Sequence, residues 1–171
     1  MKVGFLLIKI LKFISIAIFL VLLFIGYFYL PTNVAIHYND TGRPDGYIDK
    51  PTFFYATGIF VVIFNTAVSL LARLIFSIPA KLFPMPNRNY WLTDQDTSDE
   101  FREIIRNWLN SLVIIVNLFV ILCIYALLKL NTTEVAVENY QWILTGGILF
   151  LLGWILFLPF RLLIKKNSLI E

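Results

Sequence analysis

The sequence predicts an all-α integral membrane protein, a bundle of four transmembrane helices. The chain has 171 residues, of which 59% are hydrophobic and only 15% are charged. A soluble domain of this size needs more polar surface to stay in solution. The apolar residues also form long blocks, whereas a half-buried strand or helix shows an alternating or helical pattern.

Four blocks contain no Asp, Glu, Lys or Arg and hold 18 to 20 residues each: residues 13–30, 53–72, 109–128 and 141–160. At a rise of about 1.5 Å per residue, each block crosses the roughly 30 Å hydrocarbon layer as a helix. Helix is the only conformation open to a single segment in lipid, because the backbone finds no water to bond there. With their flanks, the predicted spans of this single membrane domain, residues 1–171, are 9–30, 53–76, 108–129 and 140–162.

The basic residues predict the orientation of these spans. With the amino terminus inside, eleven Lys and Arg lie on the cytoplasmic side and three lie outside, which accounts for all 14. The positive-inside rule therefore places both termini in the cytoplasm. We expect these side chains to contact lipid headgroups and not nucleic acid. The inner ones are Lys2, Lys9, Lys12, Arg73, Lys81, Arg88, Arg102, Arg106, Arg161, Lys165 and Lys166, and the outer ones are Arg43, Lys50 and Lys129.

The cytoplasmic connection, residues 78–107, begins with three prolines that predict an extended stretch: Pro79, Pro84 and Pro86. A polar and aromatic motif follows, consisting of Asn87, Arg88, Tyr90 and Trp91. Tyr and Trp favour the membrane interface because one end of each side chain is apolar and the other polar. We therefore expect this motif to run along the headgroups.

A further helix is predicted after Asp96, where Thr97 and Glu100 have the spacing of a capping box. Apolar residues then recur at steps of three and four: Phe101, Ile104, Ile105, Trp108 and Leu112. Arg102 and Arg106 occupy the other side. This pattern predicts a short amphipathic cytoplasmic helix that leads into the third span. It either rests on its neighbours and the lipid surface or binds a partner.

Few polar residues fall inside the spans. Asn65 and Asn117 lie near the middle of the second and third spans, where they either bond across helices or line a substrate path. A path usually also contains ionisable groups at mid-depth, and the sequence places none there. Gly146 and Gly153 share one face of the last helix, with Gly147 beside the first, and these glycines predict its packing face. Cys123, the single cysteine, is interpreted as a small packing residue.

The outer loop, residues 31–52, is rich in turn-forming residues. Both 39–42 and 44–46 have the chemistry of tight turns, so we expect an ordered cap on the helix ends. One His and three Asp supply residue types for metal binding or acid–base chemistry, but their spacing matches no ligand pattern. No catalytic residue, metal or cofactor is therefore predicted. The candidate ligand-binding residues of the loop are His37, Asn39, Asp45 and Lys50.

Two motifs resemble a known family. Residues 30–50 follow the pattern L-P-x-x-V-x-x-H-[aromatic]-N-x-x-G-x-P-D-G-[aromatic]-x-x-K, and residues 86–92 follow P-N-[KR]-x-Y-W-L. The first resembles the signature loop of the bacterial membrane family known as domain of unknown function 1648, which is shared with SdpI-type immunity proteins. Those proteins protect a toxin-producing cell from its own secreted killing factor. This chain has Ala35 and Tyr47 where the family often has Pro and Trp, and it lacks the further spans of SdpI-type proteins.

The resemblance implies a protein of the bacterial cytoplasmic membrane and leads to three functional hypotheses. The first is a non-enzymatic protein whose outer loop senses or binds a secreted peptide, toxin or lipid, with a regulator at the cytoplasmic motif. The second is a small transporter or transporter accessory subunit that uses Asn65 and Asn117. The third, an enzyme acting on lipid, needs an acid–base pair that only His37 and a loop aspartate supply; no enzyme is expected.

Overall fold

The computed structural model describes residues 3–133 and 135–163 and contains four long helices, a β-hairpin and two short helical turns. Each predicted span falls on one long helix, and all four helices are long and apolar enough to cross a membrane. The coarse fold class is thus confirmed, whereas the hairpin was not predicted. The elements are α1 Val3–Tyr29, β1 Asn33–Tyr38, β2 Pro44–Asp49, α2 Lys50–Leu74, η1 Ala80–Leu82, α3 Arg88–Trp91, α4 Gln95–Thr132 and α5 Glu138–Leu163.

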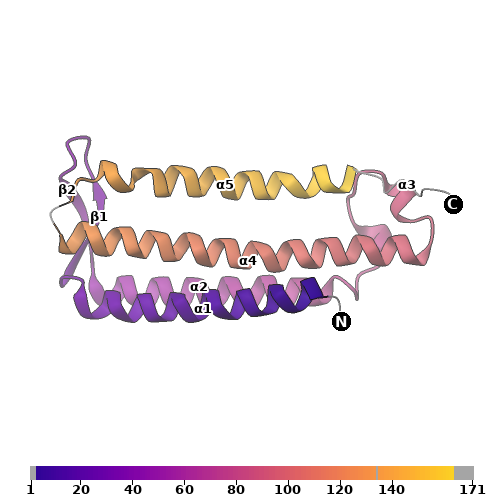
Figure 1. The fold of residues 1–171 in the computed structure, drawn as a ribbon, viewed down its shortest axis with the longest axis horizontal. Helices are drawn as coiled ribbons and strands as arrows, with labels where there is room; N and C mark the ends of the chain where they lie inside the picture. Colours follow the sequence, from indigo (N-terminus) through magenta and orange to yellow (C-terminus); the bar gives the residue numbers. More distant parts are fainter. Residues whose placement is uncertain (1–2, 134, 164–171) are drawn as a thin grey trace.

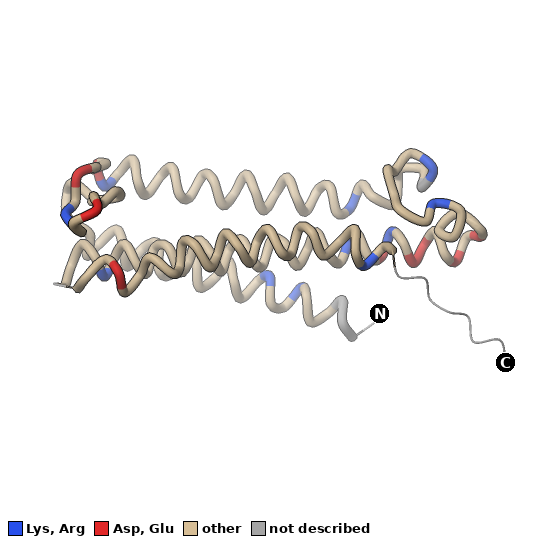
Figure 2. The backbone as a smooth tube through the Cα atoms, turned by 90° about the horizontal axis from the view of Figure 1, so that it is seen from above, with Lys and Arg blue, Asp and Glu red and all other residues tan. Residues whose placement is uncertain are grey.

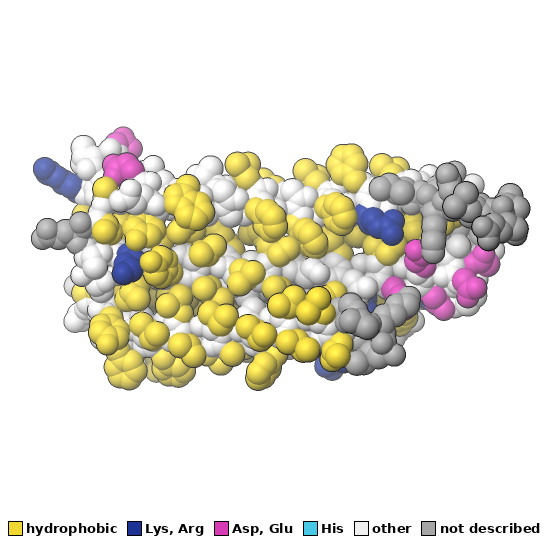
Figure 3. Space-filling view, viewed as in Figure 1, with side chains coloured by type: hydrophobic (Ala, Val, Ile, Leu, Met, Phe, Trp, Pro, Cys, Tyr) yellow, Lys and Arg dark blue, Asp and Glu magenta, His cyan; other side chains and the backbone are white. Residues whose placement is uncertain are grey.

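The surface of the helices is apolar along their middle. Figure 3 shows hydrophobic side chains over the whole length of the helical layers, with charged side chains toward the two ends. Residues such as Phe13, Phe28 and Phe160 expose 74%, 77% and 64% of their surface. Such a wide apolar surface is unfavourable in water and suits lipid. The chain is therefore a multi-pass membrane protein.

Helix α4 is the centre of the arrangement. Figure 1 shows α1 and α2 together on one side of α4, and α5 on the other. Phe19 and Leu23 of α1, Val61 of α2 and Ile124 of α4 form the main buried cluster. Among the described residues, α5 packs mainly on α4 and is not enclosed by the other long helices. The four spans are thus a three-helix unit with one flanking helix, and not an even bundle.

The contact between α4 and α5 depends on Gly147. A Cβ atom at this position would lie 2.2 Å from the Phe119 ring, so a larger residue would force that ring to move. Gly146 and Gly153, by contrast, have no neighbouring atom within 4 Å of such a Cβ position. Of the three glycines predicted to form the packing face, only Gly147 faces α4, because successive residues of a helix point about 100° apart.

A buried amide network joins the three packed helices. The side chains of Asn65 and Asn117 donate to each other over 2.8 and 3.1 Å, and the Asn117 amide also donates to the Ser15 hydroxyl over 3.0 Å. Lys12 and Ser69, which the sequence analysis did not connect with this pair, extend the network. The Lys12 ammonium donates to the Ser69 hydroxyl, which donates to the carbonyl of Asn65.

Helix α4 has 38 residues and begins earlier than predicted. Its length of about 57 Å exceeds the thickness of the hydrocarbon layer. The segment predicted as a short amphipathic helix leading into the third span is the first part of α4. Asp94 is the N-cap, and its side chain accepts from the Thr97 N–H over 2.7 Å in a capping box. The predicted box of Thr97 and Glu100 is wrong because Asp94, three residues before Thr97, caps the helix itself.

The two ends of the molecule differ in charge. We call the end with β1 and β2 the hairpin end, and the end with residues 75–94 the connection end. Figure 2 shows basic residues at both ends. Lys2, Lys165 and Lys166, part of the predicted inner set, lie outside the described residues. The described basic residues of the connection end are Lys9, Lys12, Arg73, Lys81, Arg88, Arg102, Arg106 and Arg161, and those of the hairpin end are Arg43, Lys50 and Lys129.

Candidate functional site: the exposed hairpin

The predicted outer loop is a two-stranded antiparallel sheet. Strand β1, with the sequence NVAIHY, contains the β-branched and aromatic residues that favour extended backbone. Asn39 builds the turn, because its side-chain oxygen accepts from the N–H groups of Thr41 and Arg43 over 3.0 and 2.9 Å. Gly42 has φ +74°, a conformation that favours glycine. Residues 39–42 therefore form the predicted tight turn.

Residues 44–46 do not form the second predicted turn. They belong to β2, and Gly46 pairs with His37 across the sheet. Gly46 has no positive φ; instead, a Cβ on residue 46 would lie 2.8 Å from the His37 Cβ. The glycine thus serves a close approach between strands, which its Pro-Asp-Gly context did not reveal.

Side chains of the helix ends hold the hairpin in place. Asn131 of α4 accepts from the Ala35 N–H over 2.8 Å and donates to the Ala35 carbonyl over 3.0 Å, as a neighbouring strand would. Lys50 donates to the Leu30 carbonyl over 3.0 Å, just beyond the end of α1. Val34 is fully buried. These contacts join the hairpin to the ends of α1 and α4.

Asp49 joins the hairpin to α2. It is the N-cap of that helix, and its carboxylate accepts from the Thr52 N–H over 2.9 Å. This backbone hydrogen bond, together with one from the Thr52 side chain, holds the pKa of Asp49 below its usual value. Asp49 thus stabilises the start of α2 as a carboxylate.

His37 and Asp45 are the two candidate residues whose side chains pair with each other at the surface of the hairpin. The His37 Nδ1 and the Asp45 Oδ1 are 2.5 Å apart, in a hydrogen-bonded pair across the two strands. Their side chains are 72% and 45% exposed. The other two candidates, Asn39 and Lys50, have roles in the turn and at the end of α1. The structure therefore brings together one imidazole and one carboxylate facing outward.

The hairpin also exposes an aromatic and an aliphatic side chain. Tyr47 is 57% exposed and Ile36 is 47% exposed. The Tyr38 hydroxyl is buried without a hydrogen-bond partner among the described residues, and burial, with Tyr47 nearby, raises the pKa of Tyr38. Within the described ranges, no three His, Cys, Asp or Glu side chains gather as metal ligands would. The surface is suited to binding through an apolar, imidazole and carboxylate pattern.

The second candidate motif lies at the opposite end and is built into the fold. The Trp91 indole N–H donates to the Leu162 carbonyl over 3.0 Å, and the Asn87 amide donates to the Leu163 carbonyl over 2.7 Å. Trp91 is 1% exposed and packs with Phe101 and Leu162. The motif is expected to run along the headgroups, but the Trp91 side chain is buried inside the protein, where Trp91 and Asn87 provide donors for the last carbonyls of α5.

The other two residues of this motif lie nearer the surface. Arg88 is exposed and donates to the Lys81 carbonyl over 2.7 Å. Tyr90 is half-buried, with its ring against that of Trp91 at a centroid distance of 4.9 Å. The motif as a whole fastens the connection to the end of α5.

Asn131 was not predicted as a partner of the hairpin. Its context, Asn-Thr-Thr, has only the short pattern of a glycosylation acceptor. A polar side chain at the very end of a membrane helix, beside a strand-like segment in the same outer layer, is the signal that would have pointed to it. Its partner Ala35 lies 96 residues away in the chain.

Comparisons with known proteins address the first motif. The chain matches no curated protein and no solved structure. One family model matches, over residues 14–61, which cover the second half of α1, the hairpin and the first half of α2. The matching segment includes the whole first motif, residues 30–50, and both members of the exposed pair. This part of the chain is therefore similar to the family described as Domain of unknown function (DUF1648).

Proposed function

We propose that this chain is a non-enzymatic protein of the bacterial cytoplasmic membrane whose hairpin binds an extracytoplasmic peptide, toxin or lipid, in sensing or immunity. The proposed orientation puts the hairpin end outside and the connection end, with both termini, in the cytoplasm. The charge distribution supports it, since eight described basic residues lie at the connection end and three at the hairpin end.

The exposed pair of His37 and Asp45 is the observation that carries this proposal. Other polar groups of the hairpin complete its fold: Asn39 forms the turn, Asn131 replaces a strand partner, and Lys50 caps α1. The pair, in contrast, contributes its charge and hydrogen-bonding capacity at the surface. A rigid scaffold that presents polar groups beside exposed aromatic side chains is the usual design of a recognition surface.

A transporter remains the alternative function, with Asn65 and Asn117 on the route. The observation that favours it is the polar network in the membrane interior, which extends to Lys12. Against it, Asn65 and Asn117 are 8% and 0% exposed and use their amides on each other and on Ser15. Amides that satisfy one another serve helix packing.

A growth-inhibition experiment distinguishes the two functions. Bacteria with and without the chain are exposed to a panel of purified antimicrobial peptides, and the inhibitory concentration of each is measured. Binding by the hairpin predicts a shift of at least four-fold for one peptide, lost in His37→Ala and Asp45→Ala. Asp40→Ala, an exposed aspartate of the same turn outside the pair, is the matched control and retains the shift.

The same experiment includes Asn65→Leu and Asn117→Leu. Under the proposed function these variants retain the shift if they insert, because they lie far from the hairpin surface. A shift that survives in His37→Ala and Asp45→Ala but disappears in the asparagine variants contradicts recognition by the hairpin and supports transport. Absence of any shift in the unsubstituted chain contradicts a role in immunity.

A further inference from the structure

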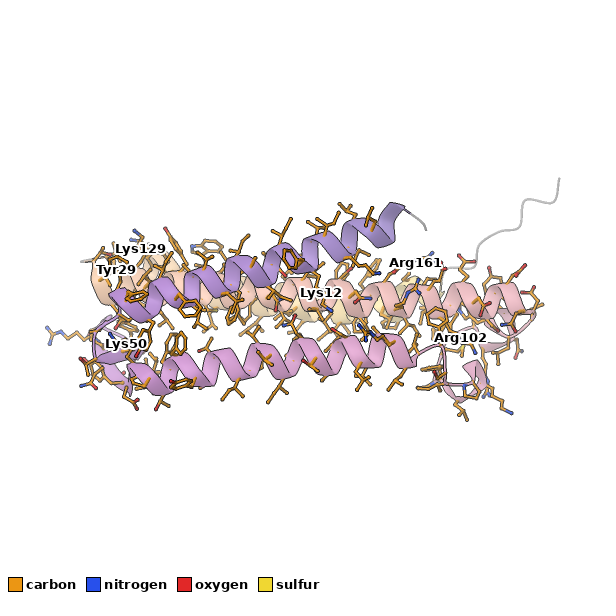
Figure 4. All side chains as sticks on the ribbon, turned by 90° about the horizontal axis from the view of Figure 1, so that it is seen from below. Lys12, Tyr29, Lys50, Arg102, Lys129 and Arg161 are labelled. Carbon is orange, nitrogen blue, oxygen red and sulfur yellow. The ribbon has the colours of Figure 1, made fainter. Side chains whose placement is uncertain are left out.

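A pocket of about 420 Å³ opens between α1, α2 and α4 near the connection end. Figure 4 shows α1 diverging from α2 toward its first residues, with Lys12 in the widening space between them. All three helices contribute polar side chains to the walls. These are Lys9, Lys12, Ser69, Arg73, Arg106 and Asn110.

The pocket has a strongly positive lining. Four of its residues are basic, and none of the described residues that line it is acidic. Lys12 of α1 and Arg73 of α2 are two of these basic residues. An anion between two such like charges relieves their repulsion. The lining therefore favours an anionic ligand.

Two of the cations are fixed by the fold. Lys12 donates to the Ser69 hydroxyl, and its backbone carbonyl accepts from Ser15 over 2.8 Å, so it belongs to the network that joins α1, α2 and α4. The Arg106 guanidinium lies 4.8 Å from the centre of the Phe76 ring. Cations that are already positioned lose less side-chain entropy when a ligand binds.

The depth of the pocket identifies the kind of anion. Lys12 lies within the membrane span 6–29, and Arg73 lies in the last turn of α2. The pocket therefore lies toward the connection end of the candidate spans, where basic side chains reach lipid headgroups. Leu70 and Leu74, next to Ser69 and Arg73 in α2, are 53% and 43% exposed and offer apolar surface to acyl chains. Basic pockets between transmembrane helices are typical sites for anionic headgroups.

We infer that this pocket binds the phosphate group of an anionic phospholipid from the leaflet at the connection end. Lys and Arg side chains donate charge-assisted hydrogen bonds to the phosphate oxygens, and the acyl chains lie along α2. The site is distinct from the hairpin and independent of the function proposed for it.

The test uses the purified full chain in a neutral detergent with fluorescent phosphatidylglycerol as the probe, and binding is measured by fluorescence anisotropy. Unlabelled phosphatidylglycerol should displace the probe at a concentration at least ten-fold lower than phosphatidylcholine with the same acyl chains. The double variant Lys9→Gln/Arg73→Gln should bind the probe at least ten-fold more weakly. Both side chains are exposed, so we expect the double variant to fold.

Arg161→Gln is the matched control, because Arg161 is a basic residue in the last turn of α5 that does not line the pocket. It should change probe affinity less than two-fold. Equal displacement by the two lipids, or an equal loss in Arg161→Gln and the double variant, overturns the proposal. Displacement by inorganic phosphate at the same concentration as phosphatidylglycerol also overturns it, in favour of a soluble anion.

A salt titration of the unsubstituted chain gives an answer even where the double variant does not fold. Raising the ionic strength from about 0.1 M to about 1 M shortens the Debye length from about 10 Å to about 3 Å. The preference for phosphatidylglycerol over phosphatidylcholine should then fall at least three-fold. A preference that does not change with salt overturns the electrostatic site.

Discussion

Gly46 and His37 face each other across the hairpin so closely that a Cβ on residue 46 would lie 2.8 Å from the His37 Cβ. His37, whose imidazole pairs with Asp45, can therefore take this position because residue 46 on the partner strand is glycine and has no side chain. Adding one methyl group at residue 46 would force His37 or its strand to move. The contact is with the His37 Cβ, which is attached to the backbone and cannot move aside as the end of a flexible side chain can.

We therefore expect Gly46→Ala to destabilise the hairpin by about 1–3 kcal/mol and to separate His37 from Asp45. Thermal unfolding in detergent and protease sensitivity within residues 31–51 measure the effect. Gly58→Ala is the control, since its Cβ meets only Leu23 at 3.7 Å and alanine favours helix. Unchanged stability and protease resistance in Gly46→Ala would show that the strands are not so close.

Trp91 provides a second prediction. Trp91→Phe keeps most of the buried ring but removes the hydrogen bond to the Leu162 carbonyl, which we expect to cost about 1–3 kcal/mol because that carbonyl is left unpaired. Trp142→Phe is the control, since Trp142 is 64% exposed. Among the described residues, its indole N–H donates to the Asn139 carbonyl of the same helix, α5. Equal thermal stability of the two variants would show that the hydrogen bond from Trp91 to the Leu162 carbonyl does not stabilise the fold.

The four spans were predictable because insertion depends on apolar length, which is a local property of the chain. The hairpin was not, because its pairing joins β1 to β2 through a turn whose chemistry suited a loop equally well. Pro44 to Gly46 looked like a turn, yet Gly46 is needed for its contact with His37. Whether a glycine forms a turn or allows a close approach between strands depends on the partner strand, which the local sequence does not show.

The positions of the two motifs show the same limit. The pattern of residues 30–50 singled out His37, Asn39, Asp45 and Lys50 as a group, but only the structure separates the exposed pair from the two residues that hold the hairpin. Trp91 followed a general preference of tryptophan for the interface. Its actual place depends on the end of α5, about 70 residues later, which no local pattern contains.

The N-cap of α4 makes stability depend on pH. The hydrogen bond from the Thr97 backbone N–H, followed by that from its side chain, lowers the pKa of Asp94. A lowered folded-state pKa means that the stabilisation is complete above the unfolded pKa and is lost as pH falls through the folded one. We expect the melting temperature to fall below about pH 4, the ordinary range of aspartate.

Asp94→Asn tests this dependence, because asparagine caps helices well but does not titrate there. Melting curves from pH 6 down to pH 3 should fall less steeply in this variant than in the unsubstituted chain. Asp96→Asn is the control, an exposed aspartate in the first turn of the same helix. If Asp96→Asn flattens the acid limb as much as Asp94→Asn, the cap is not its source.

Asn131 predicts how firmly the hairpin is held. Asn131→Ala removes both hydrogen bonds to the Ala35 backbone, and we expect it to cost about 1–3 kcal/mol because Ala35 is 5% exposed and has no water to replace them. Hydrogen exchange at the Ala35 amide should become faster. Thr132→Ala, next to it and bonded only within α4, should leave this exchange unchanged.

The proposed orientation has the most direct test. Single cysteines are placed at His37 and at Arg88 in a Cys123→Ala background, and intact cells are treated with a thiol reagent that does not cross membranes. Both side chains are exposed, one at each end of the molecule, so access to the reagent depends on the side of the membrane.

We expect labelling at position 37 and none at position 88 until the cells are opened, because the excess of basic residues at the connection end retains that end in the cytoplasm. Glu171, also expected inside, lies outside the described residues. Labelling at position 88 in intact cells, with position 37 protected, would reverse the orientation and would place the exposed pair in the cytoplasm, where it could not meet a secreted peptide.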